Sequence, residues 1–222
     1  MAVYGGPDIV TDGLVLHLDA ANTKSYPGSG NTWYDLSGNN NHSTLSGPSF
    51  GSDQYAKYMH FAGTDYADCG MNTFQPTELT ISTWINSSST GTTIILGKGV
   101  TSPLIEWGLG FGYTTKLVAR MRYYADQLLY EYSTLTNTPL MISMTAKNNS
   151  FLRIYINQDL ATEDTTVGAI QYSESYPIYL GRWSNYNPSK NFYLYNIDLY
   201  NRALEVDEIE NNYNALKGRF GL

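Results

Sequence analysis

The sequence predicts an all-β protein, an antiparallel β-sandwich that ends in one short C-terminal helix. Three observations carry this prediction. The chain of 222 residues holds 20 Tyr and 20 Gly, and these residue types favour strands and turns respectively. Short apolar stretches recur about every 12 residues between turn signals, as in a sandwich. Near the C-terminus, an alternating segment leads into apolar residues at helical spacing.

The elements follow from these patterns in order. Residues 1–12 are Gly-rich, and we expect an arm or edge strand there. A strand at 14–18 precedes a long polar loop, from residue 19 to about 49, whose Pro-Gly and Ser-Gly pairs indicate turns; its length indicates a functional or specially held segment. Further strands are predicted at 55–61, 66–69, 79–85, 92–98, 105–110, 117–122, 128–133, 140–145, 152–157, 178–180 and 192–200. No composition shift marks a linker, so residues 13–222 are predicted to form one domain.

The closing segment combines a strand with a helix. Residues 194–200 alternate between polar and apolar side chains, which is typical of a strand. Val206, Ile209, Tyr213 and Leu216 then fall on one helical face, so a helix is predicted at about 205–217. Its acidic first turn suits the helix dipole, and Gly218 is a suitable stop. Glu205 stands at the N-cap position, which Glu fills poorly.

Composition excludes several functions. The net charge is −7 with 13 scattered Lys and Arg, whereas a nucleic-acid binder should carry a basic stripe. Cys69 is the only cysteine, so no internal disulfide can form, and its neighbours indicate a buried, inert thiol. There is no signal peptide and no run of about 18 apolar residues, so we expect synthesis in the cytoplasm and no membrane insertion.

Six sequence blocks, in order, resemble laminin-G-like domains with the concanavalin-A-like jelly-roll fold. They are GLVLHLDAAN (13–22), WYDLSGNNNH (33–42), FAGTDY (61–66), LTISTWI (79–85), YLGR (179–182) and the closing LYNIDLYNRAL (194–204). The opening segment and the last residues resemble, more narrowly, such domains in structural proteins of tailed bacteriophages. The resemblance covers nearly the whole chain and implies a jelly roll.

The narrower resemblance implies a non-enzymatic virion protein: a capsid decoration protein, head fibre or tail-fibre module. Its partners would be other virion proteins, copies of itself and a cell-surface glycan, and its location would be the virion. The second hypothesis is a free carbohydrate-binding module or lectin. The third is a glycoside hydrolase, because residues 205–210 read Glu-x-Asp-x-x-Glu, as in laminarinase-type enzymes that need paired carboxylates. The helical apolar spacing favours a solvated helix face instead, so we expect no enzyme.

No cofactor is required by these patterns, although calcium is one candidate. His17, His42 and His60 lack the short spacing of a zinc site. Asp19, Asp35 and Asp198 match acidic positions of the resembled family, and the resemblance places the first and last strands side by side. Carboxylates in a folded loop suit calcium. Alternatively, Asp35 only forms turns with the backbone.

Aromatic residues in the strands of the expected curved sheet, and in the loop after residue 182, predict a glycan site, because sugars need exposed rings and planar polar groups. The candidates are Trp107, Tyr113, Tyr123, Tyr124, Trp183 and Tyr186. The alternative is that these rings cover the sheet or a subunit interface, where Tyr is also enriched.

Overall fold

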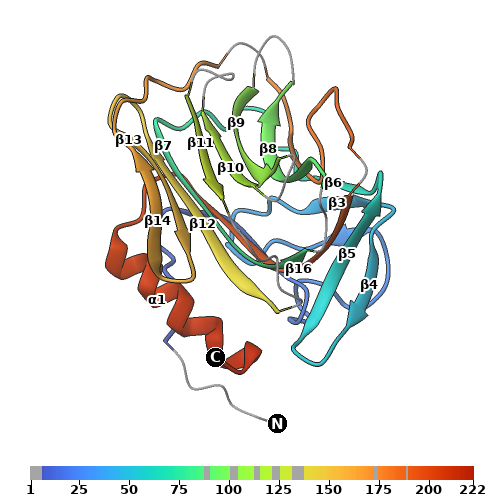
Figure 1. Ribbon diagram of the computed structural model, residues 1–222. Coiled ribbons are helices and arrows are strands. Elements are labelled where there is room, and N and C mark those ends of the chain that lie inside the picture. The colour runs from blue at the N-terminus through green and yellow to red at the C-terminus, as the bar shows by residue number, and fades with distance from the viewer. Residues whose placement is uncertain are drawn as a thin grey trace.

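The computed structural model describes residues 7–87, 91–100, 105–112, 116–121, 126–131, 138–172, 175–188 and 190–222. Two antiparallel sheets pack face to face, and a single α-helix lies on the outer side of one of them (Figure 1). The predicted fold class, a β-sandwich with one short C-terminal helix, is confirmed.

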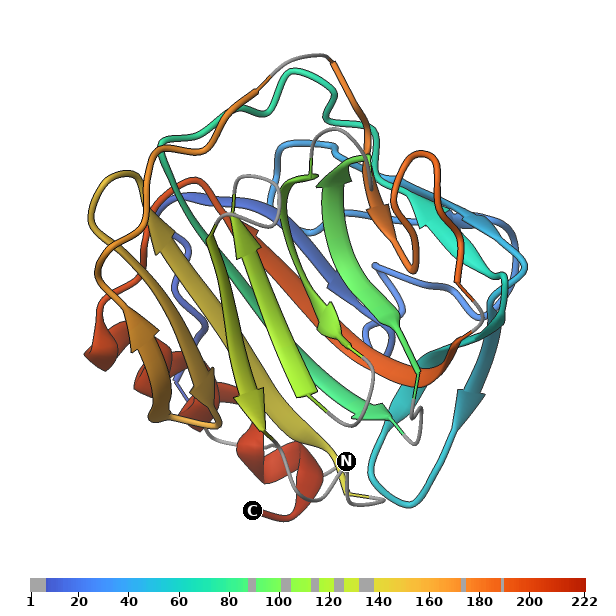
Figure 2. The ribbon, with the colours of Figure 1, turned by 45° about the horizontal axis from the view of Figure 1, so that its top comes forward.

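The first sheet runs in the order β14 (Asp159–Asp164), β13 (Phe151–Ile156), β12 (Leu140–Lys147), β7 (Glu78–Ser87), β16 (Lys190–Tyr200), β5 (Lys57–Gly63) and β4 (Ser49–Ser52), with β1 (Leu14–Asp19) also paired to β16. The second sheet runs in the order β11 (Asp126–Glu131), β10 (Lys116–Met121), β9 (Ile105–Phe111), β8 (Thr93–Gly99), β15 (Ile178–Leu180), β6 (Tyr66–Asp68), β3 (Ser43–Ser46) and β2 (Thr32–Trp33). Figure 2 shows β8 to β11 side by side in the foreground.

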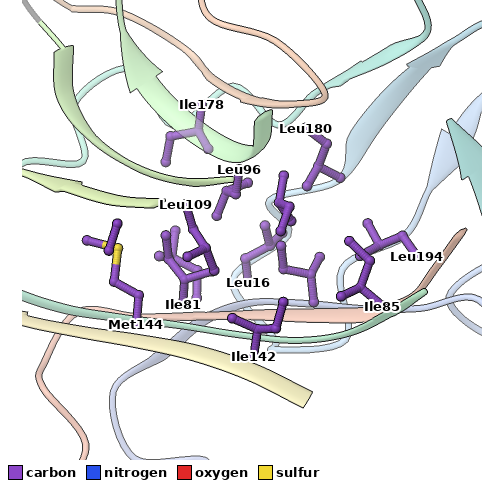
Figure 3. Packing of buried hydrophobic residues seen from close by; sticks show 14 of the residues in the cluster. Leu16, Ile81, Ile85, Leu96, Leu109, Ile142, Met144, Ile178, Leu180 and Leu194 are labelled. Atoms are coloured by element: carbon purple, nitrogen blue, oxygen red, sulfur yellow. The ribbon is translucent and has the colours of Figure 1, made fainter. Parts of the chain in front are cut away.

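The hydrophobic core fills the space between the two sheets (Figure 3). Ile81 and Ile142 from the first sheet point towards Leu96 and Leu109 from the second, and all four are almost completely buried. Alternate residues of each strand therefore face the core, as the period of two in the sequence predicts. Burial of this apolar surface is the main force that holds the sheets together.

The first and last strands of the sandwich are neighbours, as predicted. β1 pairs with the second half of β16, and His17 lies directly opposite Asp198. The first half of β16 pairs with β5 along the same edge, while β7 pairs along the other. This register places the first and last strands of the chain next to each other within the first sheet.

The predicted helix is α1 (Val206–Leu216), followed by the 3₁₀ helix η2 (Lys217–Phe220). Ile209 is buried, and Trp84 on the outer face of the first sheet stacks against Tyr213 and Phe220. α1 ends at Leu216 with Lys217 as its C-cap, so the α-helix stops directly before Gly218 as predicted, but the left-handed φ of 75° lies at Gly221. The 3₁₀ turn explains the difference, because it continues the helical path past Gly218.

The acidic run of residues 205–210 lies at the start of α1, as predicted, and not on a strand. Glu205 is the N-cap residue, and its backbone N–H donates to Glu208 Oε2 at 2.9 Å. The same Glu208 carboxylate forms a two-point ion pair with Arg202 at 2.7 and 2.6 Å. Glu208 thereby helps to cap the start of the helix, where the N-cap residue Glu205 is of a type that caps helices poorly.

Residues 8–12 of the predicted arm lie against the chain's own helix. The Val10 N–H donates to Asn212 Oδ1 at 2.8 Å, and the Tyr200 hydroxyl donates to the Val10 carbonyl at 3.0 Å. Asn211 Nδ2 donates to the Asp8 carbonyl. This described part of the arm is therefore attached to α1 and β16.

Four short strands were not predicted. β2 and β3 lie inside the segment 19–49, which was expected to be a loop, and β4 follows at its end. β14 is an edge strand with four charged or polar residues among its six, Asp159, Thr162, Glu163 and Asp164. These strands pair at or near the sheet edges, where one face or one side is open to water, so they lack the apolar alternation by which strands are recognised.

Candidate functional site

A pocket with a volume of about 560 Å³ lies on the outer face of the second sheet. On β10, Leu117, Ala119 and Met121 point into the core, so Lys116, Val118 and Arg120 point outwards. The lining also takes residues from β9, β11 and the turn that follows β15. The lining residues are Thr92, Ile105, Gly112, Lys116, Val118, Arg120, Gln127, Leu129, Trp183 and Tyr186.

The hairpin of β10 and β11 supplies one side of the pocket as three cross-strand pairs. Lys116 lies opposite Glu131, Val118 opposite Leu129, and Arg120 opposite Gln127. Lys116 Nζ is 2.7 Å from Glu131 Oε1. At the other end, Arg120 Nε donates to Gln127 Oε1 at 3.0 Å, which holds the guanidinium beside the amide. The hairpin therefore presents two polar pairs with an apolar pair between them.

A tight turn, residues 183–186, supplies the opposite side. The Trp183 N–H donates to the Tyr186 carbonyl at 2.9 Å, and the Ser184 N–H donates to the Gly99 carbonyl at 3.0 Å. Trp183 is only 2% exposed, whereas Tyr186 is 39% exposed. The turn therefore buries one ring against the sheet and offers the other to solvent.

Two facing glycines make room for the Trp183 indole. Gly97 on β8 lies directly opposite Gly108 on β9. A Cβ atom at either position would lie 2.2 Å from the Trp183 ring. Only glycine lets the indole rest on the backbone of the sheet at this point. The position of Tyr186 in the pocket thus depends on Gly97 and Gly108.

The Arg182 side chain helps to hold the 183–186 turn in place. Its Nε donates to the Trp183 carbonyl at 2.8 Å, and its guanidinium lies 4.8 Å from the Tyr66 ring and 5.0 Å from the Tyr179 ring. Such cation–π contacts hold a charged group in place without an acidic partner. The turn is fixed to the sheet by both its backbone and its neighbouring side chain.

The structure brings together two of the six predicted glycan residues, Trp183 and Tyr186. The prediction is wrong for Trp107, which is completely buried between the sheets because it shares the inward side of β9 with Leu109 and Phe111. Tyr113, Tyr123 and Tyr124 lie outside the described residues. Sequence reasoning missed Arg120, Gln127 and Leu129. The alternation of Lys116, Val118 and Arg120 could have shown that these three share a face, but not that the face lines a pocket.

The three aspartates predicted to hold calcium lie around His17. Its Nδ1 is 2.5 Å from Asp198 Oδ1, and its backbone N–H donates to Asp35 Oδ1 at 2.9 Å. Asp19 is held by Arg219 of η2 through two contacts of 2.9 Å each. Asp35 also accepts hydrogen bonds from Ser37 N, Ser37 Oγ and Asn41 N. Each carboxylate is thus bound by donors of the protein.

The surroundings of His17 favour its charged form. Burial alone would lower the pKa of His17, but attraction to Asp198, Asp19 and Asp35 outweighs it and raises the pKa above 6.5. In the part of the chain that the structure describes, no three His, Cys, Asp or Glu side chains form a group that could hold a metal ion. The geometry therefore does not support calcium at Asp19, Asp35 and Asp198, and indicates instead that they surround a protein cation.

The expectation of a buried, inert thiol has a structural counterpart. Cys69 is buried, and burial raises the pKa of its thiol to about 12, so the thiolate form is rare at neutral pH. Across the described ranges, no helix combines the length and the apolar character that crossing a membrane requires.

A family model matches the sequence of this chain. The model of the concanavalin A-like lectin/glucanases superfamily, of the laminin G type, matches residues 61–210. This is more than half of the chain, so the chain belongs to this family. The resemblance to laminin-G-like, concanavalin-A-like domains is confirmed. No curated protein matches the sequence significantly.

Solved structures share the fold at low sequence identity. The binding domain of Paraclostridial Mosquitocidal Protein 1 has a TM-score of 0.71 at 19% identity, covering 92% of this chain and 52% of that one. The receptor binding domain of botulinum neurotoxin C/D mosaic serotype has a TM-score of 0.68 at 16% identity, covering 92% and 51%. A mutant Trypanosoma rangeli sialidase with trans-sialidase activity has a TM-score of 0.71 at 16% identity, covering 98% and 35%. The chain spans about half or less of these proteins.

Proposed function

We propose that this chain, a member of the concanavalin A-like lectin/glucanases superfamily, is a non-enzymatic binding domain that holds a glycan in the pocket between the β10–β11 hairpin and the 183–186 turn. The observation that carries the proposal is the exposed Tyr186 ring, held by a buried Trp183, opposite the planar side chains of Arg120 and Gln127. A flat ring stacks on a sugar, and planar polar groups hydrogen-bond its hydroxyls.

The pocket also has the apolar surface that such a site needs. Ile105, Val118 and Leu129 line it between the polar pairs. Leu129 is 44% exposed, which makes it one of the few large apolar side chains on the described surface. An exposed apolar surface flanked by polar groups is typical of a recognition site. Binding domains of toxins that share the fold agree with this proposal.

A hydrolase is less well supported. Retaining and inverting glycosidases use two carboxylates beside the scissile bond. None of the described residues that line the pocket is Asp or Glu. The Glu-x-Asp-x-x-Glu run lies instead on α1, where Glu208 is paired with Arg202.

The experiment is a comparison of wild type with Tyr186→Ala on an immobilised glycan array. We expect the wild type to bind a defined set of glycans and the variant to bind them at least tenfold more weakly, because it loses the stacking ring. Tyr34→Ala is the matched control, since Tyr34 is similarly exposed (41%) but belongs to the loop after β2. Binding by Tyr186→Ala at the wild-type level would refute the site.

A finer proposal places this domain in a virion. We propose that the chain is a structural component of a tailed bacteriophage, as a capsid decoration protein, head fibre or tail-fibre module, displaying the pocket to a cell-surface glycan. The support is the resemblance of the opening segment and the last residues to phage structural proteins. Other virion proteins and copies of this chain would be its partners.

Mass spectrometry and immunogold labelling of purified particles test the virion role. If the chain is a virion component, particles purified from the cells that produce it should contain the chain. Its recovery only in the particle-free fraction, together with glycan binding, would favour the alternative of a free carbohydrate-binding module or lectin.

A further inference from the structure

Cationic side chains line the pocket. Two of its lining residues are cationic, Lys116 and Arg120, and none of the described lining residues is acidic. The chain as a whole carries a net charge of −7. Lys116 is paired with Glu131 beside the pocket, but the groups that the lining itself offers to a ligand are cations, and such groups favour ligands of the opposite sign.

Resting on the glycan function proposed above, we propose that the ligand is an acidic glycan and that Arg120 recognises a carboxylate on one of its sugar rings. The guanidinium is planar and matches the two oxygens of a carboxylate. Arg120 Nε is held by Gln127 Oε1, so the orientation of the group is set before a ligand arrives. A preorganised group loses less entropy on binding.

Lys116 supplies a second cation at the other end of the pocket. It is four residues from Arg120 on the same face of β10, or about 13 Å by the rise of a strand. Its partner Glu131 has an 80% exposed side chain. An ion pair this exposed adds little stability, so a ligand carboxylate can replace Glu131 at low cost. The separation of the two cations suits an oligosaccharide rather than a single sugar.

The apolar pair between these cations completes the fit. Val118 and Leu129 lie between the Lys116–Glu131 pair and the Arg120–Gln127 pair. Sugar rings present apolar C–H faces between their polar edges, so this order of polar, apolar and polar groups along the hairpin matches an extended acidic chain. A phosphate or sulfate ester would offer Arg120 a similar charge, and the experiment below separates these sources.

Isothermal titration with matched probes tests the proposal. Oligogalacturonate is compared with its methyl ester, and unsulfated chondroitin oligosaccharide with its carboxyl-reduced form. We expect each acidic probe that binds to do so at least tenfold more tightly than its neutral counterpart at 50 mM salt, with the difference shrinking at 500 mM salt. Dextran sulfate is compared with dextran to test whether the pocket binds sulfate esters.

Arg120→Gln should weaken binding of the acidic probe about tenfold more than binding of the neutral probe, because both probes lose a hydrogen bond but only the acidic one loses an ion pair. Arg120→Lys keeps the charge but loses the planar fork, so its affinity for the acidic probe should lie between those of the wild type and Arg120→Gln. Lys147→Gln is the matched control, because Lys147 also pairs with a Glu across strands but lies on β12 of the first sheet. Thermal melting should confirm that all variants remain folded.

The outcomes separate this inference from the proposed function. Equal affinity for acidic and neutral probes, an unaffected Arg120→Gln variant, or binding of dextran sulfate without any carboxylated probe would overturn the inference and leave glycan binding standing. Absence of binding to every glycan on the array would overturn the proposed function, and this inference with it.

Discussion

His17 Nδ1 lies 2.5 Å from Asp198 Oδ1, and this contact joins the first and last strands of the sandwich. Asp198 is 2% exposed, and its other oxygen accepts a hydrogen bond from Asn196 Nδ2 at 3.1 Å. Asp35 and Asp19 lie close enough to act on the same imidazole, and Asp19 in turn binds Arg219. A cluster of charges thus links β1, β16, the 35–41 loop and η2.

The first prediction concerns stability and pH. Because the pKa of His17 is raised in the folded state, its contribution to stability is fully present below the unfolded pKa of about 6.5. It is lost as pH rises through the folded pKa. The difference in unfolding free energy between wild type and His17→Gln should be about 3 kcal/mol at pH 5.5, and smaller at pH 9. Urea unfolding at both values measures it.

The control for this prediction is Asp198→Asn. In that background, the attraction that raises the pKa of His17 most is removed, so His17→Gln should then have an effect that depends much less on pH. If the difference in unfolding free energy between wild type and His17→Gln were constant from pH 5.5 to 9, His17 and Asp198 would not form a charged pair.

The second prediction concerns calcium. Both oxygens of Asp19 bind Arg219, and Asp35 binds four donors of the chain. We therefore expect the melting temperature to stay unchanged within about a degree in chelator or in millimolar calcium. A saturating ligand at a hundred times its Kd would add about 2.7 kcal/mol, so a fall of several degrees in chelator would restore the calcium site that the sequence predicted.

The third prediction concerns the glycines against which the Trp183 ring packs. Gly97→Ala places a methyl group 2.2 Å from the indole, so the ring must move. We expect a loss of about 1–3 kcal/mol in unfolding free energy, together with weaker glycan binding because Tyr186 moves with the turn. Gly91→Ala is the matched control, since a Cβ there meets nothing within 4 Å. Equal effects of the two substitutions would contradict the packing described.

The fourth prediction concerns a buried ion pair. Lys98 and Glu106 are completely buried and 3.7 Å apart, and Lys98 Nζ also donates to the carbonyls of Asn72 and Tyr176. Lys98→Met leaves Glu106 buried without its cation and should cost about 3–5 kcal/mol. The double variant Lys98→Met with Glu106→Leu should recover part of this loss. Chemical denaturation of the single and double variants measures the recovery, and no recovery would show that the carbonyl contacts dominate.

How much the sequence could predict differs between the fold and the site. Alternation identified the long strands and helical spacing identified α1, because each pattern is local. The contact between His17 and Asp198 joins residues 181 positions apart. The family resemblance placed their strands side by side, but the contact itself was not predicted. The short strands β2 and β3 have no alternation to read, since pairing with longer neighbours defines them.

The site was harder to predict because a tryptophan does not reveal which way it points. Trp107 and Trp183 look alike in the sequence, but β9 places Gly108 and Gly110 on the outer side and Trp107, Leu109 and Phe111 on the inner side. The alternating glycines were the available signal that something covers this face. The pairing of Arg120 with Gln127 depends on the hairpin register, which composition does not give.

The most direct test of the central claim is a crystal structure of the chain soaked with the tightest glycan from the array. We predict that the sugar lies in the pocket on the outer face of the second sheet, with a ring on Tyr186 and a carboxylate at Arg120. A glycan seated elsewhere, for example beside α1 or on the β4–β5 hairpin, with this pocket empty, would contradict it.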